Sequence, residues 1–495
     1  MYRKSQSQQM TFDFALPFGG KLRRDNRWVI LADLIPWDEI DNQYALNFEN
    51  SDFGCPGKPS RIALGALIIK ERLGVSDRET VEQISENAYL QYFLGFPGFE
   101  DTKPFHHTSM VHFRKRFTKK MLAEINEMII KQTVDSQQES SDDDSSEDKP
   151  NKGKLIIDAT CTPADITFPT DLKLLNEARE KTEEIIDCMH QVFIGERRKP
   201  RTYRQNARKD YLALAKQKKT KKSALRKGIR KQLGYVKRNL KTIASMAEEG
   251  LLPCLDRRLY RLVLVCHEVY RQQLWLYENR AKSIPDRIVN LYQPHVRPIV
   301  RGKAQSLTEF GAKISVSLVD GLSRVDTLSW DAYNETVDFQ RQVESYRHRY
   351  GHYPESVHAD QIYRSRDNRR FCKKNEIRLS GPPLGRPPKQ TELNKQEIRA
   401  LKRQRRQDEL DRNAIEGKFG QGKRRFTLNR IMAKLAETSE TVIMVSFIVM
   451  NLEKLLAGVF LSTLNIFSAF KMAYDKTVQR WIWALHQTIG IAKAA

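Results

Sequence analysis

Two short candidate strands, separated by a part of the chain that includes a long segment without strand character, place the strongest constraint on the fold. Residues 155–157 run directly into Asp158, and residues 356–359 run into Asp360. The apolar run 155–157 fits a buried strand whose last residue meets solvent, and residues 356–359 offer a second short strand. If the two strands are neighbours in one sheet, their terminal carboxyl groups lie at the same edge. The sequence therefore predicts a sheet that a long insertion interrupts.

The remaining signals in this part of the chain predict a mixed α/β layer. Residues 312–319 and 323–330 alternate apolar and polar side chains around Asp320 and Gly321, a pattern typical of a β-hairpin. Helical patterns follow at residues 334–349 and 364–375, and from about Gln396 onward. The order of strand, hairpin, helix, strand and helix indicates the α/β class.

The insertion, residues 172–297, has helical composition and an unusual charge. Its residues 197–241 contain nineteen Lys or Arg and one acid, Asp210. Since so one-sided a run cannot be neutralised by its own ion pairs, we interpret it as a surface that binds DNA phosphates. The alternative is a solvated helix face without a partner.

The charge of the whole chain points in the same direction. A formal net charge of +24 over 495 residues favours a polyanionic partner, because Lys and Arg gain affinity for phosphates by releasing condensed counterions. Nucleic acid is the leading candidate. A ribosomal or nucleoid-packaging protein would be equally basic, so charge says nothing about catalysis.

The N-terminal part, residues 1–134, is predicted to be an all-α domain with helix-turn-helix spacing. Apolar periodicity predicts helices over residues 60–73, 76–93 and 109–121. The third of these presents Arg114, Lys115 and Arg116, which we expect to contact DNA. A packing or dimerisation role for this module is the alternative.

An acidic segment ends this domain. Residues 135–154 contain almost no apolar side chain, so they cannot repay the entropy of ordering and are expected to form a flexible linker. The predicted organisation is therefore a helical domain (1–134), a linker (135–154), an α/β domain in two pieces (155–171 and 298–495) and the basic insertion (172–297).

Cysteine usage and apolar runs indicate a reducing compartment and no membrane. The six cysteines include no Cys-x-x-Cys pair, which argues against a disulfide framework or a zinc ribbon. The N-terminus lacks the apolar core of a signal peptide. The most apolar run, residues 442–452, is too short to span a bilayer and is expected to be a buried helix. We expect a cytoplasmic, nucleoid-associated protein.

A third carboxylate is expected from the C-terminal helical region. Glu416 lies four residues after Arg412 and seven before Lys423, so in one continuous helix these three side chains share a face. Gly420 and Gly422 weaken that continuity, because glycine costs about 1 kcal/mol within a helix. With Asp158 and Asp360, Glu416 completes a set of acids suited to two metal ions in phosphoryl transfer.

These residues resemble a known family. Asp158, Asp360 and the spacing Arg412-x3-Glu416-x6-Lys423 are similar to the Y-R-E-K signature of DDE transposases from bacterial insertion sequences. Residues 63–73, 77–84 and 169–172 also resemble segments of these transposases. One departure concerns the signature Tyr, whose position is occupied by Glu409; Arg405 and Arg406 nearby are candidates for the phosphate contacts.

The resemblance implies a fold, an activity and partners. It implies an RNase H-like catalytic domain in which Asp158, Asp360 and Glu416 ligate two Mg²⁺ or Mn²⁺ ions, while Arg412 and Lys423 contact the DNA backbone. It also implies strand cleavage at the element's inverted repeats, strand transfer into target DNA, and a homodimer on DNA. No covalent protein intermediate is needed.

Other residues and other functions compete with this interpretation. Asp165, Asp171, Asp326 and Asp331 are expected to be ordinary loop or solvent-facing acids, and His358 and Trp330 to be packing residues. One rival function is a degenerate transposase that binds DNA without cutting it. Another is an RNase H-like nuclease without strand transfer, such as a junction resolvase.

Overall fold

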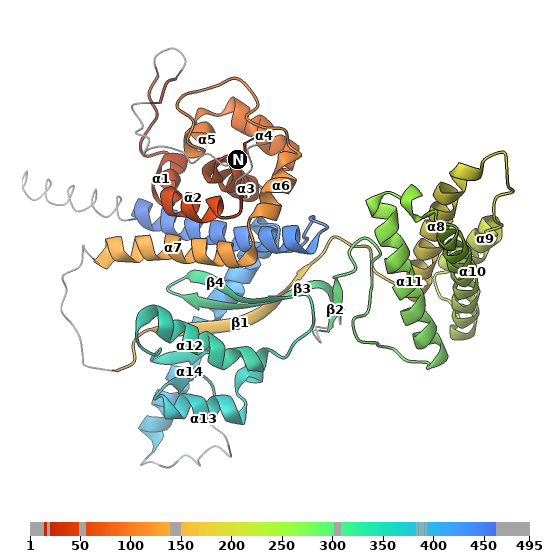
Figure 1. Ribbon diagram of the computed structural model, residues 1–495. Coiled ribbons are helices and arrows are strands. Elements are labelled where there is room, and N and C mark those ends of the chain that lie inside the picture. Colours follow the sequence, from red (N-terminus) through yellow and green to blue (C-terminus); the bar gives the residue numbers. More distant parts are fainter. Residues whose placement is uncertain are drawn as a thin grey trace, which may run out of the picture. The chain divides into compact units, whose positions relative to one another are not determined.

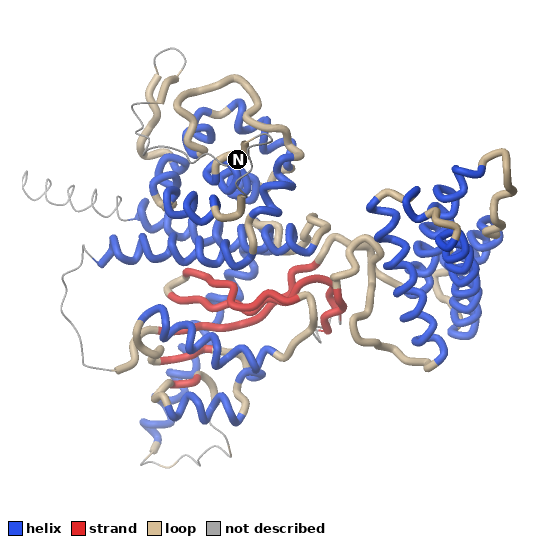
Figure 2. Tube along the Cα trace, in the orientation of Figure 1, coloured by secondary structure: helices blue, strands red, loops and turns tan. Residues whose placement is uncertain are grey.

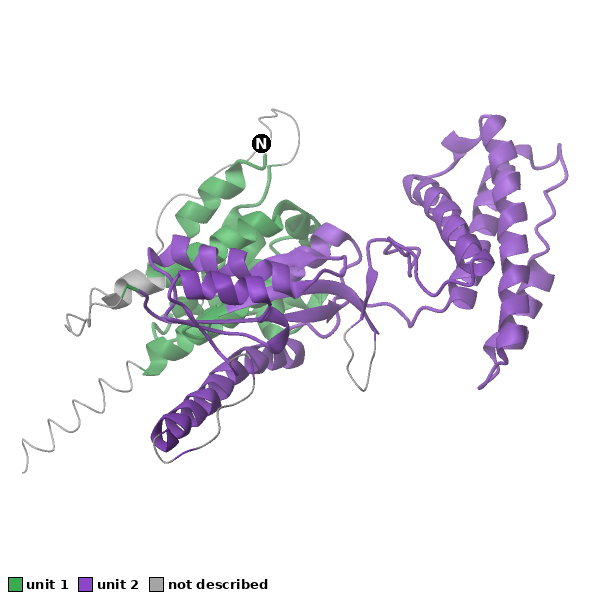
Figure 3. Cartoon of the chain, turned by 90° about the horizontal axis from the view of Figure 1, so that it is seen from below, with its two compact units in different colours: residues 1–150, 318–324, 444–495 green, residues 151–317, 325–443 purple. Residues whose placement is uncertain are grey.

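The computed structural model describes residues 14–16, 20–48, 56–138, 150–300, 308–382, 385, 391 and 394–461. The chain divides into two compact units, coloured separately in Figure 3. Unit 1 comprises residues 1–150, 318–324 and 444–495, and unit 2 comprises residues 151–317 and 325–443. Most of the predicted acidic linker, residues 139–149, lies outside the described residues.

Unit 1 is helical (Figure 1). Its labelled helices are α1 (Arg27–Asp33), α2 (Trp37–Ala45), α3 (Ser60–Leu73), α4 (Asp77–Glu86), α5 (Ala88–Phe93), α6 (Ser109–Arg116) and α7 (Lys119–Gln138). The predicted start at Ser76 is confirmed, because its side chain accepts a hydrogen bond from the Glu79 N–H at 3.1 Å. The predicted second helix is divided at Asn87, whose side chain caps α5, and the predicted third helix ends at Arg116.

Two helices of unit 1 were not predicted. Helices α1 and α2 are short, which leaves too few turns for a periodic signal. Their aromatic residues nevertheless pack on the core: the rings of buried Trp28 and partly buried Trp37 lie against Phe93 at centroid distances of 5.3 and 5.6 Å. Tertiary contacts therefore stabilise helices that local pattern does not reveal.

A mixed sheet forms the centre of unit 2 (Figure 2). Its strands are β1 (Lys154–Pro163), β2 (Arg297–Val300), β3 (Thr308–Val319), β4 (Leu322–Ser329), β5 (Ser356–His358) and β6 (Arg378–Leu379). The order is β2-β3-β1-β5-β6, with β4 also paired to β3. Strands β1, β5 and β6 are parallel, whereas β2 and β3 are antiparallel. The predicted α/β class is confirmed.

Two sequence predictions about the strands were incomplete. Strand β1 continues to Pro163, so Asp158 lies in the middle of this strand and not at its end, as the sequence analysis expected. The run after Asp158 mixes small and polar residues, but its side chains from Ala159 to Thr162 are buried. Strands β2 and β6 are four and two residues long and gave no signal.

The predicted hairpin is present. Asp320 and Gly321 both have positive φ angles, 51° and 81°, as a two-residue type I′ turn requires. Asp320 is therefore a turn residue, as expected.

The remaining helices of unit 2 flank the strands in sequence. They are α12 (Asp338–Tyr350), α13 (Arg366–Lys374) and α14 (Lys395–Arg425), with short 3₁₀ turns η4 (Glu335–Val337) and η5 (Gln361–Tyr363). Helix α14 packs against β1 and β5. It runs through Gly420 and Gly422 without a break, so the expected weakening there does not interrupt it, and the buried side chains of Ile415 and Phe419 hold it in place.

The insertion forms a helical bundle, as its composition predicted (Figure 1). It contains α8 (Asp171–His190), α9 (Arg204–Ala215), α10 (Lys222–Glu248) and α11 (Arg257–Glu278), with 3₁₀ turns η2 (Gln191–Phe193) and η3 (Leu252–Cys254). Helices α8, α10 and α11 share one apolar core that includes Leu175, Val236 and Cys266.

A long apolar helix covers Ala436–Leu461 and is the one described helix long and apolar enough to cross a membrane. Two thirds of its most apolar window, 67%, is buried in the protein. Within unit 1 its polar side chains are paired: Ser446 donates to Glu71 at 2.7 Å, and Asn451 donates to Asn126 at 2.9 Å. These features fit the buried core helix that the run 442–452 predicted.

A pH-dependent contribution to stability is expected from His295. Burial lowers the pKa of His295 to about 4, with Arg261 and Arg297 adding to the effect. The imidazole packs edge-on against Trp330 at 4.4 Å. Since the unfolded chain takes up this proton near pH 6.5 and the folded chain near pH 4, stability is retained above pH 6.5 and lost as the pH falls toward 4.

The size of this loss is roughly 2 kcal/mol. Chemical denaturation of wild type and His295→Gln at pH 7 and pH 4.5 measures it, with exposed His348→Gln as the control. The wild type and the control should lose more stability than His295→Gln. Equal losses in all three proteins would refute the role of His295.

Candidate active site

The register between β1 and β5 relates the positions of the two predicted aspartates, Asp158 and Asp360. Strands β1 and β5 are parallel, with Lys154 opposite Ser356, Leu155 opposite Val357 and Ile156 opposite His358. Continuing this register by two residues places Asp158 opposite Asp360, which directly follows β5. Neighbouring strands lie about 4.8 Å apart. Asp360 caps the 3₁₀ turn η5 by accepting a hydrogen bond from the Gln361 N–H at 2.7 Å.

Helix α14 is anchored to the strands on both sides of this position. Asp408 is buried and accepts two hydrogen bonds from the Arg378 guanidinium at 2.9 and 2.8 Å. One turn further on, Asp411 forms an ion pair with Lys154 at 2.8 Å. Because Arg378 belongs to β6 and Lys154 to β1, these pairs fix the rotation of α14. The sequence analysis did not single out Asp408; its spacing of four residues before Arg412 was the available signal.

Arg412 connects two of the three candidate acids. Its guanidinium lies 3.5 Å from Asp360 and 2.9 Å from Glu416, measured nitrogen to oxygen. Asp408, Arg412 and Glu416 follow one another at intervals of four, so α14 presents them on one face. The side chains of Asp360 and Glu416 are about half exposed, at 56% and 52%. The site is therefore open to a large substrate.

Asp158 lies deeper than the other two acids and has an altered pKa. Burial raises the pKa of its carboxyl to about 6, and the negative charges of Glu335 and Asp360 add to the rise. The Ala159 N–H, which donates to this carboxylate at 2.8 Å, and the charge of Arg412 oppose it. Asp158, Asp360 and Arg412 therefore interact electrostatically across three elements.

Glu335 is a fourth acid at this site that the sequence analysis missed. It begins η4 and forms an ion pair with Lys313 of β3 at 2.8 Å, where both side chains are mostly buried. The turn η4 is fixed beside η5 by a hydrogen bond from Thr336 to the Ile362 carbonyl at 2.8 Å. The sequence analysis placed Glu335 in the first turn of a helix predicted over residues 334–349, where an acid is ordinary, which explains the omission. The α-helix in fact begins at Asp338.

The donor chemistry of the site suits a hard divalent cation, although the acids are not gathered around one point. Asp158, Asp360 and Glu416 offer carboxylate oxygens, the ligands that Mg²⁺ prefers. Among the described residues, no three His, Cys, Asp or Glu side chains form a group that could hold a metal ion. Instead the guanidinium of Arg412 supplies the positive charge between Asp360 and Glu416. The residues therefore fit a metal by their chemistry and by their need for a cation.

The competing acids are occupied elsewhere in the structure. Asp165 pairs with Arg430 at 2.7 Å, and Asp171 pairs with Arg287 at 2.6 Å. Asp326 accepts a hydrogen bond from Gln342 at 2.9 Å, and Asp331 lies 3.5 Å from Arg297. For Asp165, Asp171 and Asp331 these contacts agree with the ordinary roles that the sequence analysis assigned. Asp326 was expected to face solvent, but its side chain is only 5% exposed and also lies 3.7 Å from Arg349.

His358 and Trp330 also have structural surroundings. The ring of His358 is buried, and its Nε2 shares a hydrogen bond with Ser356 at 3.0 Å. Trp330 packs against Val289 and Val296, and its indole N–H donates to Glu440 at 3.0 Å. Both were expected to be packing residues.

The residues of α14 that were predicted to contact DNA lie on both sides of Glu416 in the sequence of this helix. Lys423 is on the same continuous helix, in its last turn. Arg405 is half-buried and Arg406 is exposed, two turns or less before Arg412. Glu409, at the position of the signature Tyr, is exposed.

The predicted DNA-contacting residues of α6 differ among themselves. The Arg114 guanidinium is mostly buried and donates two hydrogen bonds to Asp77, at 3.0 and 2.5 Å. This geometry favours a structural ion pair between α6 and α4 over the expected DNA contact. Arg116 stacks over Phe48 at 4.8 Å, whereas Lys115 is exposed.

This difference leads to contrasting expectations for two neighbouring substitutions. Arg114→Ala should lower the free energy of unfolding by about 1–3 kcal/mol, because it leaves Asp77 without its partner. Lys115→Ala should leave stability unchanged within about 0.5 kcal/mol and reduce the salt dependence of DNA binding by about one phosphate contact. Denaturation and binding titrations at several salt concentrations measure both. A stable Arg114→Ala variant would contradict the assigned ion pair.

Comparisons with known proteins agree with this site. Residues 357–453 match the family model of the transposase DDE domain, and residues 17–116 match a transposase domain model, DUF772. The first match includes Asp360 and Glu416. The chain is also 30% identical over 153 residues to the uncharacterized protein ORF8 in the nfe locus of Rhizobium meliloti, which covers 30% of this chain and 68% of that protein. No solved structure matches.

A mixed sheet and a helix that carry three separate acids, together with the two domain matches, identify a transposase. The chain belongs to the DDE transposases of insertion sequences, and it has the catalytic activity of that family. Transposases act on DNA, and DDE transposases generally use divalent metals.

Proposed function

We propose that this transposase binds the terminal inverted repeats of its insertion sequence, cleaves DNA strands at the element's ends and joins them to target DNA. The observation that best supports this proposal is that Arg412 of α14 pairs with Asp360 and Glu416 while its charge also acts on Asp158 of β1. In this proposal the sheet of unit 2 is an RNase H-like catalytic domain, and residues 172–297 are an insertion into it.

Asp158, Asp360 and Glu416 would hold two Mg²⁺ or Mn²⁺ ions. When bound, such ions activate the attacking oxygen and stabilise the leaving oxygen of a phosphodiester. The protein contributes rigidity, because β1 and the anchored part of α14 fix two of the three carboxylates. Asp158 lies in a partly buried position, whereas the other two acids are about half exposed.

Arg412 and Lys423 would bind the DNA backbone. Arg412 pairs with Asp360 and Glu416, and its side chain is 31% exposed. A metal ion held by these acids would supply positive charge beside them, and Arg412 would contact a DNA phosphate. A planar guanidinium binds phosphate oxygens in pairs and so orients the strand for in-line attack.

The partners and the compartment follow from the same proposal. Two ends must be brought together for strand transfer, so we expect a homodimer on duplex DNA. The basic charge and the absence of Cys-x-x-Cys pairs fit a cytoplasmic enzyme associated with the nucleoid.

A cleavage and strand-transfer assay with the DNA sequences that flank the gene tests this function. Purified protein, labelled end fragments and a supercoiled target are incubated with Mg²⁺, Mn²⁺ or EDTA. The expected result is metal-dependent cleavage at the repeat ends and covalent joining to the target. Cleavage without joining would favour an RNase H-like nuclease, and binding without cleavage would favour a degenerate transposase.

A further inference from the structure

Helix α10 of the insertion carries a cationic stripe along one exposed face. Six cations lie symmetrically about Gly234. Three precede it by seven, four and three residues (Lys227, Arg230 and Lys231), and three follow it by three, four and seven residues (Lys237, Arg238 and Lys241). These intervals put all six side chains on the face of Gly234. All six are exposed. At 1.5 Å per residue, the stripe is roughly 21 Å long.

The opposite face of α10 is apolar and fixes the orientation of the stripe. Its buried residues include Leu233, Val236 and Ile243, which belong to the core shared with α8 and α11. Rotation of α10 would expose this core, so the cations are held toward solvent. The helix contains no acidic residue from Lys222 to Ala247, so nothing within it neutralises them.

Gly234 stands at the centre of the stripe and serves no packing purpose in the protein. A Cβ atom added at this position would meet no atom within 4 Å. Glycine in the middle of a helix is destabilising relative to alanine, so a helix gains nothing from it unless something must approach closely. Gly234 therefore leaves the backbone without a side chain between Arg230, Lys231, Lys237 and Arg238.

Few of the surrounding cations are paired. In residues 197–241, all of which are described, carboxylate partners are present for Arg197, Lys199, Arg204 and Lys231. Arg238 has aromatic partners instead of a carboxylate: its guanidinium carbon lies 5.1 Å from the ring centroid of Tyr203 and 4.9 Å from that of Tyr235. Lys227, Arg230, Lys237 and Lys241 have neither an ion pair nor an aromatic partner. An external polyanion is the partner that such a surface fits.

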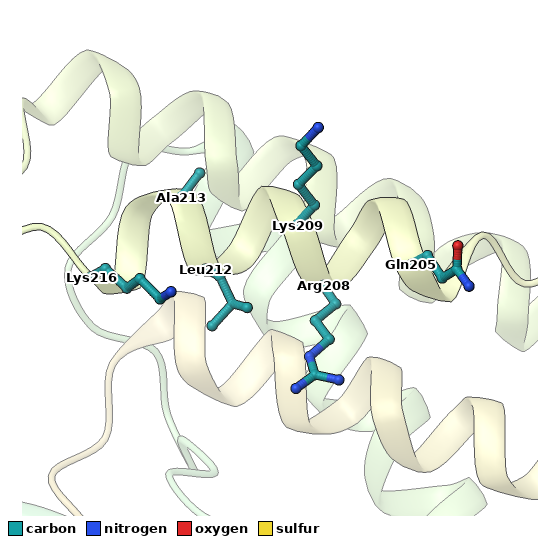
Figure 4. A pocket seen from close by; sticks show the side chains of 6 residues that line it. All are labelled: Gln205, Arg208, Lys209, Leu212, Ala213 and Lys216. Atoms are coloured by element: carbon teal, nitrogen blue, oxygen red, sulfur yellow. The ribbon is translucent and has the colours of Figure 1, made fainter.

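The neighbouring helix α9 extends this basic surface. It packs on α10 and carries a shallow hollow lined by Gln205, Arg208, Lys209, Leu212, Ala213 and Lys216. Figure 4 shows Arg208 and Lys209 extending to opposite sides of α9. Three of the six lining residues, Arg208, Lys209 and Lys216, are basic, so the hollow adds positive charge to this part of the insertion.

We propose that the α10 stripe centred on Gly234 binds the sugar–phosphate backbone of duplex DNA without sequence preference, away from the reacting phosphates. Its length corresponds to about six base pairs at 3.4 Å each. The absence of a side chain at Gly234 lets the backbone come close enough for Arg230, Lys231, Lys237 and Arg238 to contact phosphates on both sides. None of the three candidate catalytic acids takes part.

Binding of a 30-base-pair duplex that lacks the terminal repeat tests this inference. The full-length chain is titrated in EDTA, by fluorescence anisotropy, at several salt concentrations, so that neither cleavage nor end recognition contributes. The quadruple variant Lys227→Gln, Arg230→Gln, Lys237→Gln and Lys241→Gln should bind at least about tenfold more weakly. Its slope of log K against log salt should be shallower by about 3–4 units.

A matched control removes four charges elsewhere in the insertion. This control variant loses the same net charge as the stripe variant, at exposed positions of α11 and of the segment after it. Its substitutions are Arg257→Gln, Arg258→Gln, Arg261→Gln and Lys282→Gln. This control should keep most of the salt slope. An equal loss in the control and the stripe variant would show a general charge effect and overturn the proposal.

Gly234 provides an independent test that leaves every charge in place. Gly234→Leu should weaken duplex binding about tenfold, while its melting temperature stays the same or rises by about 2–4 °C, since leucine favours helix. A variant that is stable and binds as tightly as wild type would overturn the proposal, as would an unchanged salt slope in the quadruple variant. Because cleavage is not measured, these outcomes are separate from failure of the proposed catalytic function.

Discussion

Replacing any one of the three acids, by Asp158→Asn, Asp360→Asn or Glu416→Gln, should reduce metal-dependent strand cleavage by about 10³-fold. Each change removes one carboxylate charge while keeping the shape of the side chain. Metal ions stabilise the transition state by several kcal/mol, and each 1.36 kcal/mol corresponds to a factor of ten in rate. Cleavage rates are measured on labelled end fragments at saturating Mg²⁺.

The same variants should still bind the transposon ends when assayed in EDTA. Asp165→Asn is a suitable control, because Asp165 follows the same strand but pairs with Arg430, whose side chain is 66% exposed. The control should retain cleavage within about threefold, as expected when a surface ion pair is weakened. Substantial cleavage by any one of the three variants would refute the assignment of that residue.

Asp408→Ala should impair both stability and catalysis, although Asp408 is not expected to contact DNA. The substitution removes the buried partner of Arg378 and so detaches α14 from β6. We expect the free energy of unfolding to fall by about 1–3 kcal/mol, because this is the usual contribution of a hydrogen bond to a charged group. Cleavage should fall by about 10²-fold, because a displacement of about 1 Å at a catalytic group has that effect.

The measurements are urea denaturation and single-turnover cleavage at a temperature where the variant remains folded. The charge-reversed pair Asp408→Arg with Arg378→Asp tests whether the anchor itself matters, since it restores opposite charges across the two elements. Glu409→Gln, one residue away and exposed, is the control. Asp408 has no positioning role if the folded Asp408→Ala variant cleaves DNA at the control rate.

The sequence was most informative where the chain has regular patterns. The hairpin turn, the helices α3 and α4 and the helical nature of the insertion follow from periodicity and turn chemistry. The sequence analysis predicted that Asp158 and Asp360 lie at the same edge only if their strands are neighbours in one sheet. The parallel pairing of β1 and β5 meets this condition. The continuity of α14 was doubted because of Gly420 and Gly422, and there packing of Ile415 and Phe419 outweighs helix propensity.

Sequence patterns did not predict the contacts between segments that are distant in the chain. Asp408 appears in the sequence as one charge among many on a basic helix, and its burial depends on Arg378 thirty residues away. Glu335 occupies a turn, and its proximity to Asp158 depends on how η4 meets η5. Arg114 appeared to be one of three equivalent cations, until its ion pair with Asp77 distinguished it.

The parallel pairing of β1 and β5 makes the spacing of Asp158 and Asp360 independent of the chain that joins them. The pairing, and not the intervening length, sets how far apart the two carboxyl groups lie. Closing a longer loop costs little extra entropy, because that cost grows only with the logarithm of loop length. The insertion can therefore be exchanged, shortened or enlarged during evolution while the cutting chemistry is preserved. Relatives with other insertions would be able to hold DNA differently and still cut it in the same way.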